Sequence, residues 1–116
     1  MEKRSFEVDY DKEHDIVSIF RAGAKSKVSL DIALPNGDVI IDYSSEGQII
    51  GLEIFNASHY LPALKDLNPS SLKGKFSVQY GPNWAEIAFE IASPSISQPI
   101  VNRIFSPYNK EHILEA

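Results

Sequence analysis

Four acidic residues stand at alternate positions in the segment DYDKEHD, namely Asp9, Asp11, Glu13 and Asp15. Side chains at every second position converge on one ion in calcium-binding loops, so the spacing suggests cation binding. Such a loop also needs glycine at its sixth position and glutamate at its twelfth, where this chain has His14 and Phe20. The segment therefore predicts a solvated turn between two strands.

The histidines at positions 14, 59 and 112 are far apart in the sequence. His59, together with Glu53 and Asp66, is the best candidate for an acid–base or metal-dependent hydrolase site. No two histidines have the spacing of one helical turn, and serine elbows, phosphate loops and dinucleotide fingerprints are missing from the sequence. We expect no metal and no cofactor, and we favour a protein that is not an enzyme.

Two features are candidates for contact with a partner. Arg21, Lys25 and Lys27 form a basic stretch with small residues between them, and Trp84 follows a Gly-Pro-Asn turn. An exposed tryptophan is a good anchor in a protein interface. The alternatives are a solvated loop for the basic stretch, and a lid over the end of a sheet for Trp84.

Length and charge restrict the function classes. The 116 residues suit one domain, and the net charge is −5. Residues 1–56 carry eleven acids and six bases, so this half supplies the whole net charge and argues against general nucleic-acid binding. The segment MEKRSFEVDY lacks the apolar core of a signal peptide, and no apolar run approaches the ~20 residues that span a bilayer. With no cysteine in the chain, we expect a cytoplasmic protein without disulfides.

Apolar residues alternate with polar ones in most of the chain, which predicts strands at 5–10, 16–21, 39–43, 50–54, 74–80, 85–92 and 100–105. Gly47 suits a hairpin turn that needs a left-handed backbone. Gly51 interrupts the next strand, and we expect a large neighbour, Tyr43, to lie over it. A short helix at 57–67 follows, capped by Asn56 or Ser58 and broken at Pro62.

These elements predict an α+β fold in a single domain, residues 1–116. It is mainly an antiparallel sheet of six or seven strands in meander hairpins, with one short helix near 57–67. An all-β barrel or sandwich is the alternative. Residues 76–91 match residues 6–21 without a gap, so a degenerate duplicated hairpin competes with chance similarity between strands.

Half of the chain resembles a known family. The positions that carry the likeness are Tyr10, Asp11, Asp15, Asp42, Tyr43, Gly47, Gly51, Glu53 and Asn56-Ala57-Ser58. Over about residues 6–60, this pattern resembles the small prokaryotic family called domain of unknown function 2283. Asn56 replaces the usual aspartate, and residues 70–116 form a strand-rich extension outside the likeness. The resemblance implies no reaction, and for some members it implies pairing with small toxin proteins.

We therefore expect an interaction or self-associating module: a homodimer, or a complex with a small basic protein partner in which this chain has the antitoxin-like role. A small hydrolase that uses His59 and nearby carboxylates is the alternative function.

Overall fold

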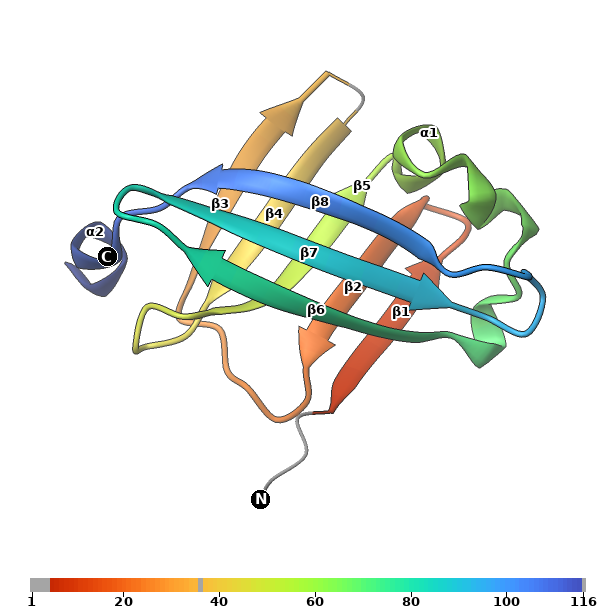
Figure 1. Ribbon diagram of the computed structural model, residues 1–116, viewed down its shortest axis with the longest axis horizontal. Helices are drawn as coiled ribbons and strands as arrows, with labels where there is room; N and C mark the ends of the chain where they lie inside the picture. The colour runs from red at the N-terminus through yellow and green to blue at the C-terminus, as the bar shows by residue number, and fades with distance from the viewer. Residues whose placement is uncertain (1–4, 36, 116) are drawn as a thin grey trace.

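The computed structural model describes residues 5–35 and 37–115, which form two antiparallel sheets (Figure 1). The five-stranded sheet has the order β1-β2-β5-β4-β3, and the three-stranded sheet has the order β6-β7-β8. The strands are β1 (Phe6–Asp11), β2 (Ile16–Arg21), β3 (Val28–Leu34), β4 (Gly37–Tyr43), β5 (Ile49–Phe55), β6 (Lys73–Tyr80), β7 (Trp84–Ala92) and β8 (Ile100–Pro107).

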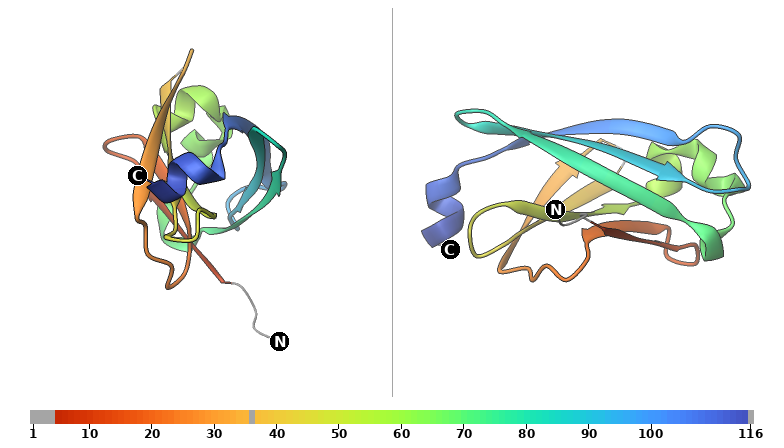
Figure 2. Two further views of the ribbon diagram at one scale, coloured as in Figure 1. Left: turned by 90° about the vertical axis from the view of Figure 1, so that its left-hand side faces the viewer. Right: turned by 60° about the horizontal axis from the view of Figure 1, so that its bottom comes forward.

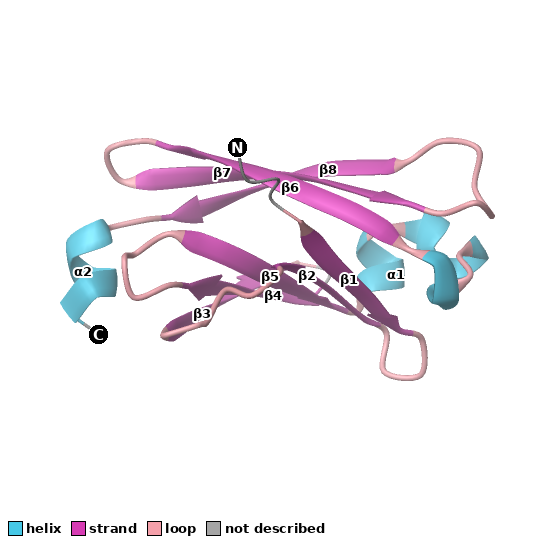
Figure 3. Cartoon of the chain, turned by 90° about the horizontal axis from the view of Figure 1, so that it is seen from below, coloured by secondary structure: helices cyan, strands magenta, loops and turns pink. Residues whose placement is uncertain are grey.

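The two sheets pack face to face with their strands crossing (Figures 2 and 3). Their inner faces share one hydrophobic core, in which Ile19, Leu52, Ile87 and Ile91 are completely buried. Within the described residues the sheets do not close into a barrel. Burial of alternate apolar residues on both sheets is what fixes the register, because a slip of one residue would expose each strand's apolar side.

The hairpin of β4 and β5 forms as the sequence predicts. Gly47 has φ +79° in the turn, and the Ser44 amide donates to the Gln48 carbonyl across it at 2.8 Å. The pairing shifts register between Asp42 and Tyr43, so that Tyr43 pairs with Ile49 and Ile50 is the extra residue of a β-bulge. Ile49, rather than Ile50, therefore joins Leu52 and Ile54 in the core, although Ile50 is also buried.

The neighbour of Gly51 is Phe20, not Tyr43 as expected. Gly51 pairs with Phe20 on β2, and a Cβ atom at Gly51 would lie 2.6 Å from Cδ1 of the Phe20 ring. Tyr43 points into the core and is completely buried. The expectation was wrong because Tyr43 points to the inner face of the sheet with Val39 and Ile41, whereas Gly51 is at an outward-facing position with Phe20 and Asp42.

The helical segment after β5 is short and divided by proline. It consists of α1 (Ala57–Tyr60) and the 3-10 helices η1 (Pro62–Asp66) and η2 (Pro69–Ser71). Pro62 is the first residue of η1, where its missing amide hydrogen leaves no hydrogen bond unmade. Ala57, Leu61, Leu64 and Leu67 close one end of the core. A second helix, α2 (Lys110–Glu115), lies at the opposite end of the molecule (Figure 1).

The predicted fold class is confirmed: the described chain is mainly antiparallel, with short helices near 57–67. It has eight strands rather than six or seven, because residues 28–34, which the predicted set of strands does not include, pair with β4 along their full length. The two hairpins proposed as a repeat differ in register, since Tyr10 pairs with Val17 whereas Tyr80 pairs with Ala85. No helix in the described part of the chain is long and apolar enough to cross a membrane.

Candidate functional site

Asp15 connects the β1–β2 turn to the start of α1. Its carboxylate accepts hydrogen bonds from the Tyr10 hydroxyl at 2.7 Å, the Ser58 amide at 2.9 Å and the Ser58 hydroxyl at 2.8 Å. The Asp15 carbonyl accepts from the Ala57 amide at 2.9 Å. Asn56 itself has φ +52° and makes no side-chain cap. Asp15 therefore caps α1 from a distant turn, and the predicted capping by Asn56 or Ser58 is wrong.

These contacts change the acidity of both partners. Burial acts to raise the pKa of the Asp15 carboxyl, but the hydrogen bonds from Tyr10 and Ser58 outweigh it and hold the pKa below its ordinary value. Burial, the hydrogen bond to Asp15 and the charge of Asp15 raise the pKa of the Tyr10 hydroxyl to about 12. The ionised carboxylate and the neutral phenol are thus the forms that stabilise this junction.

The outer face of the five-stranded sheet is acidic. Among residues 5–35 and 37–115, the strand register places seven carboxylates on it and no lysine or arginine; the acids are Glu7, Asp9, Asp11, Asp31, Asp38, Asp42 and Glu53. Half-buried apolar side chains lie between them, from Ile16, Phe20, Ile40 and Phe55. Figure 3 shows no element of the described chain packed on this side of the sheet. We call this surface the acidic face.

Asp42 and Glu53 form an unusual pair within the acidic face. Asp42 pairs with Gly51, two residues from Glu53 on the same side of β5, so the two carboxyl groups are diagonal neighbours. Asp42 is 5% exposed; its Oδ1 accepts from the Ser29 hydroxyl, whereas its Oδ2 is buried and has no donor in the part of the chain that the structure describes. Burial, and then the charge and hydrogen bonding of Asp42, raise the pKa of Glu53.

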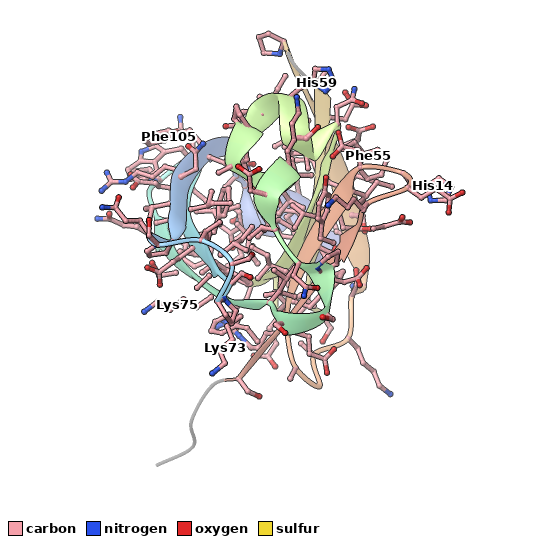
Figure 4. The ribbon with its side chains drawn as sticks, turned by 90° about the vertical axis from the view of Figure 1, so that its right-hand side faces the viewer. His14, Phe55, His59, Lys73, Lys75 and Phe105 are labelled. Carbon is pink, nitrogen blue, oxygen red and sulfur yellow. The ribbon has the colours of Figure 1, made fainter. Side chains whose placement is uncertain are left out.

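The structure does not gather the three histidines. His14 lies in the β1–β2 turn, where its Nδ1 is 2.8 Å from Asp11 Oδ2, and His112 lies on α2 at the other end of the molecule. His59 is exposed, with Nδ1 3.9 Å from Asp15 Oδ2, and Figure 4 shows it apart from His14. Among residues 5–35 and 37–115 no three histidine or acidic side chains could hold a metal ion.

The other hydrolase candidates are also separate. Glu53 is in the middle of β5 on the acidic face, paired with Ser18 and Ile40, whereas Asp66 is an exposed residue at the end of η1. The hydrolase hypothesis requires a pocket shared by His59 and carboxylates, and no observation in the described residues supports one.

The basic stretch has three different environments. Arg21 lies on the inner side of β2 opposite Phe6, Lys25 is exposed in the loop, and Lys27 donates to the Leu114 carbonyl at 3.3 Å. Trp84 is 37% exposed and packs over Gly81, with its ring 6.5 Å from that of Phe105. Trp84 is thus partly exposed, as an anchor for a partner would be, and partly packed against its own chain, as a lid would be.

The sequence reasoning missed the acidic face, because it treated the acids at 9–15 as one turn. The available signal was the alternation itself: Glu7, Asp9 and Asp11 occupy the side of β1 opposite Phe6, Val8 and Tyr10. Which other strands bring acids to the same side depends on strand order, which the sequence does not state.

The chain is similar to known proteins over the part that forms the five-stranded sheet. The family described as "Protein of unknown function (DUF2283)" matches residues 7–58. The uncharacterized protein MJ0789 of Methanocaldococcus jannaschii is 43% identical over 51 residues, which cover 44% of this chain and 40% of that protein. No solved structure matches the chain significantly.

The match begins in β1 and ends in α1, so it contains the five-stranded sheet, the Asp15 junction and the acidic face. Residues 7–58 are therefore a DUF2283 domain, and strands β6–β8 lie beyond it.

Proposed function

We propose that the protein is a non-catalytic interaction module that binds a basic protein through its acidic face. Seven carboxylates on that face, with no basic neighbour on the described strands, produce a negative potential that attracts and orients a cationic partner. The half-buried Phe20 and Phe55 supply apolar contact area between the charges, and Figure 4 shows Phe55 on this side of the molecule. An antitoxin-like role, in which this face binds a small basic toxin, is one form of the proposal.

The observation that carries the proposal is the Asp42–Glu53 pair. A buried carboxylate oxygen without a donor, beside a second acid, is destabilising in the free protein. Only a protonated Glu53 can donate to Asp42; when Glu53 is ionised, Oδ2 lacks a donor. A lysine or arginine from a partner relieves this repulsion, so the pair supports affinity for a cationic side chain at the expense of stability.

The test uses small basic proteins encoded by genes beside that of this protein, each produced together with it and then purified for affinity measurement. Asp9→Asn with Asp31→Asn should weaken binding at least about tenfold, since surface charges steer and stabilise such complexes. Glu86→Gln with Glu90→Gln changes net charge equally but alters the three-stranded sheet, and it should leave the affinity unchanged. Equal losses in both double variants, or no basic protein bound, would refute the proposal.

Glu53→Gln should have opposite effects on stability and binding. Because the folded-state pKa of Glu53 is raised, its contribution to stability is present below the ordinary value of 4.5 and is lost as pH rises through the folded value. At pH 7 the free energy of unfolding of Glu53→Gln should therefore be roughly 0.5 kcal/mol higher than that of wild type, because the like-charge repulsion is removed. Urea denaturation measures this change.

The same variant should bind the basic partner several-fold more weakly, because the partner's cation loses one carboxylate. For wild type, affinity should fall as pH decreases through the raised pKa of Glu53, and this step should be absent in Glu53→Gln. Isothermal titration calorimetry at several pH values measures both. A variant that is less stable and binds normally would show that Glu53 is structural only.

We also propose self-association through the edge of β8, on the side opposite the acidic face. Val101 and Phe105 on this edge strand are each 64% exposed, and Figure 4 shows Phe105 on the far side from Phe55. Charges around them are balanced by Lys75–Glu90 and Arg103–Glu86 ion pairs, each 3.4 Å. Pairing through β3, an edge strand of the five-stranded sheet, would place two acidic faces side by side, so charge favours β8 over β3.

Sedimentation equilibrium should show a dimer of wild type at about 100 µM. Val101→Asn with Phe105→Asn should shift the protein to monomer at that concentration, because the exposed apolar contact is lost. Leu30→Asn, which changes the 37%-exposed leucine of β3, is the matched control and should remain dimeric. Trp84 fluorescence should change with concentration in wild type and in the control, but not in the double variant. A monomeric wild type, or dissociation by Leu30→Asn instead, would exclude this interface.

A further inference from the structure

Arg21 has no partner for its guanidinium in the described part of the chain. Its Nε is buried without an acceptor, and neither an ion pair nor a side-chain hydrogen bond forms from it to residues 5–35 or 37–115. An arginine beside the core normally pairs with a carboxylate or carbonyl oxygen, since an unpaired buried donor is costly. An anionic ligand at this position would supply the acceptor that Arg21 Nε lacks in the described chain.

A cavity of about 380 Å³ lies next to Arg21, between β2, β6 and the start of β5. Its polar lining includes Gln48, Ser77 and Tyr80, and no aspartate or glutamate of residues 5–35 or 37–115 lines it. The Tyr80 oxygen accepts from the Ile49 amide at 2.8 Å, so its own hydrogen remains free to donate. The lining thus has an excess of donors around one cationic group, which is the chemistry that recognises an anion.

The other wall of this cavity is apolar. Phe6 and Phe76 line it, with their rings in edge contact at 4.9 Å between centroids. Ordinary phosphate has no group to place against these rings, whereas an organic acid has both a charged head and an apolar body. A planar carboxylate also matches the two-pronged geometry of a guanidinium.

We propose that this cavity binds a small organic carboxylate, with the carboxylate on Arg21 and the apolar body against Phe6 and Phe76. The site is separate from the acidic face, because Arg21 is on the inner side of β2. It is also independent of the binding of a basic protein. The net charge of −5 opposes anions at long range, so a simple fragment should bind weakly.

The test titrates the full chain with sodium benzoate at constant ionic strength and follows the backbone amide and Arg21 Nε resonances by NMR. Benzoate should shift Arg21 Nε and the amides of residues 76–80, with a dissociation constant on the order of 1 mM. Inorganic phosphate supplies charge without an apolar body, and benzyl alcohol supplies the ring without charge. Each should bind at least several-fold more weakly than benzoate.

Arg21→Gln should reduce benzoate affinity at least tenfold, and Arg21→Lys should lose most of it because an ammonium cannot form the two-pronged contact. Arg103→Gln, on the outer side of β8, removes an equal charge and should bind benzoate normally. Circular dichroism establishes that each variant is folded. No shift with benzoate, equal binding of phosphate, or retained affinity in folded Arg21→Gln would each overturn the proposal.

Discussion

Replacement of Asp15 by alanine is expected to lower the free energy of unfolding by about 3 kcal/mol. The change removes three hydrogen bonds to a carboxylate, from Tyr10 and twice from Ser58. It leaves α1 without a cap and places alanine at φ +57°, where aspartate is better tolerated. Urea denaturation followed by circular dichroism measures the loss.

Two comparisons separate the side chain from the backbone. Asp15→Gly tolerates the positive φ, so the remaining loss reports the hydrogen bonds together with the roughly 0.5–1 kcal/mol entropic cost of glycine. A double-mutant cycle with Ser58→Ala should give a coupling of roughly 1 kcal/mol or more. Glu13→Ala, in the same turn and exposed, should cost little. If Asp15→Ala costs no more than Glu13→Ala, the junction does not stabilise the fold.

The Asp15 junction also predicts how stability depends on pH. Since the folded-state pKa of Asp15 is lowered, its contribution is present above the ordinary value of 3.8 and is lost as pH falls through the folded value. The raised pKa of Tyr10 has the opposite sense: its contribution is complete below 10.0 and is lost as pH rises through about 12. At acidic pH, the free energy of unfolding of Asp15→Asn should depend less on pH than that of wild type.

Gly37→Ala should also be strongly destabilising, by roughly 3 kcal/mol. Gly37 begins β4 with φ +149°, a conformation that side-chain-bearing residues rarely adopt, and an added Cβ would collide with the main-chain carbonyl oxygen of Phe55. The Cβ of the following residue, Asn56, would lie 3.1 Å from the new atom. The Phe55–Asn56 backbone cannot move freely, because the next amide, that of Ala57, donates to Asp15.

The matched control is Gly23→Ala. Gly23 has φ +78°, but a Cβ atom added there would have no other atom within 4 Å, so the change should cost only about 1 kcal/mol of backbone strain. Thermal unfolding of both variants measures the difference. Comparable stability of Gly37→Ala and Gly23→Ala would show that the contact with Phe55 relaxes without cost.

The local elements follow from the residues themselves. Alternation over 39–43 and 50–54 predicts two strands that each bury one face, and Gly47 predicts the turn between them. In the structure, Val39, Ile41 and Leu52 are buried and Gly47 has a positive φ. Pro62 predicts the interruption that divides α1 from η1. These predictions succeed because each cause acts over only a few residues: side chains alternate between the faces of a strand, glycine adopts positive φ, and proline lacks an amide hydrogen.

The extra residue at Ile50 shows where local reasoning ends. Alternation from Ile54 backward assigns Ile50 to the core, but pairing with β4 inserts a bulge and sends Ile49 there instead. Gly51 itself is outside the shift: it pairs regularly with Asp42 on β4 and with Phe20 on β2, so Phe20, and not Tyr43, covers it. A bulge depends on how two strands align, so neither strand contains it alone.

The sequence by itself determined that this protein is a strand-rich, cysteine-free chain with an acidic first half, and that residues 7–58 resemble a family of unknown function. Only the tertiary structure decided that β2 and β5 lie between β1 and β4, which collects seven carboxylates of the described strands on one face and leaves Asp42 Oδ2 without a donor from those strands. It also decided that Asp15 caps a helix 43 residues away. The physical reason is that side-chain period fixes which side of a strand a residue occupies, whereas strand order depends on long-range packing of complementary apolar faces.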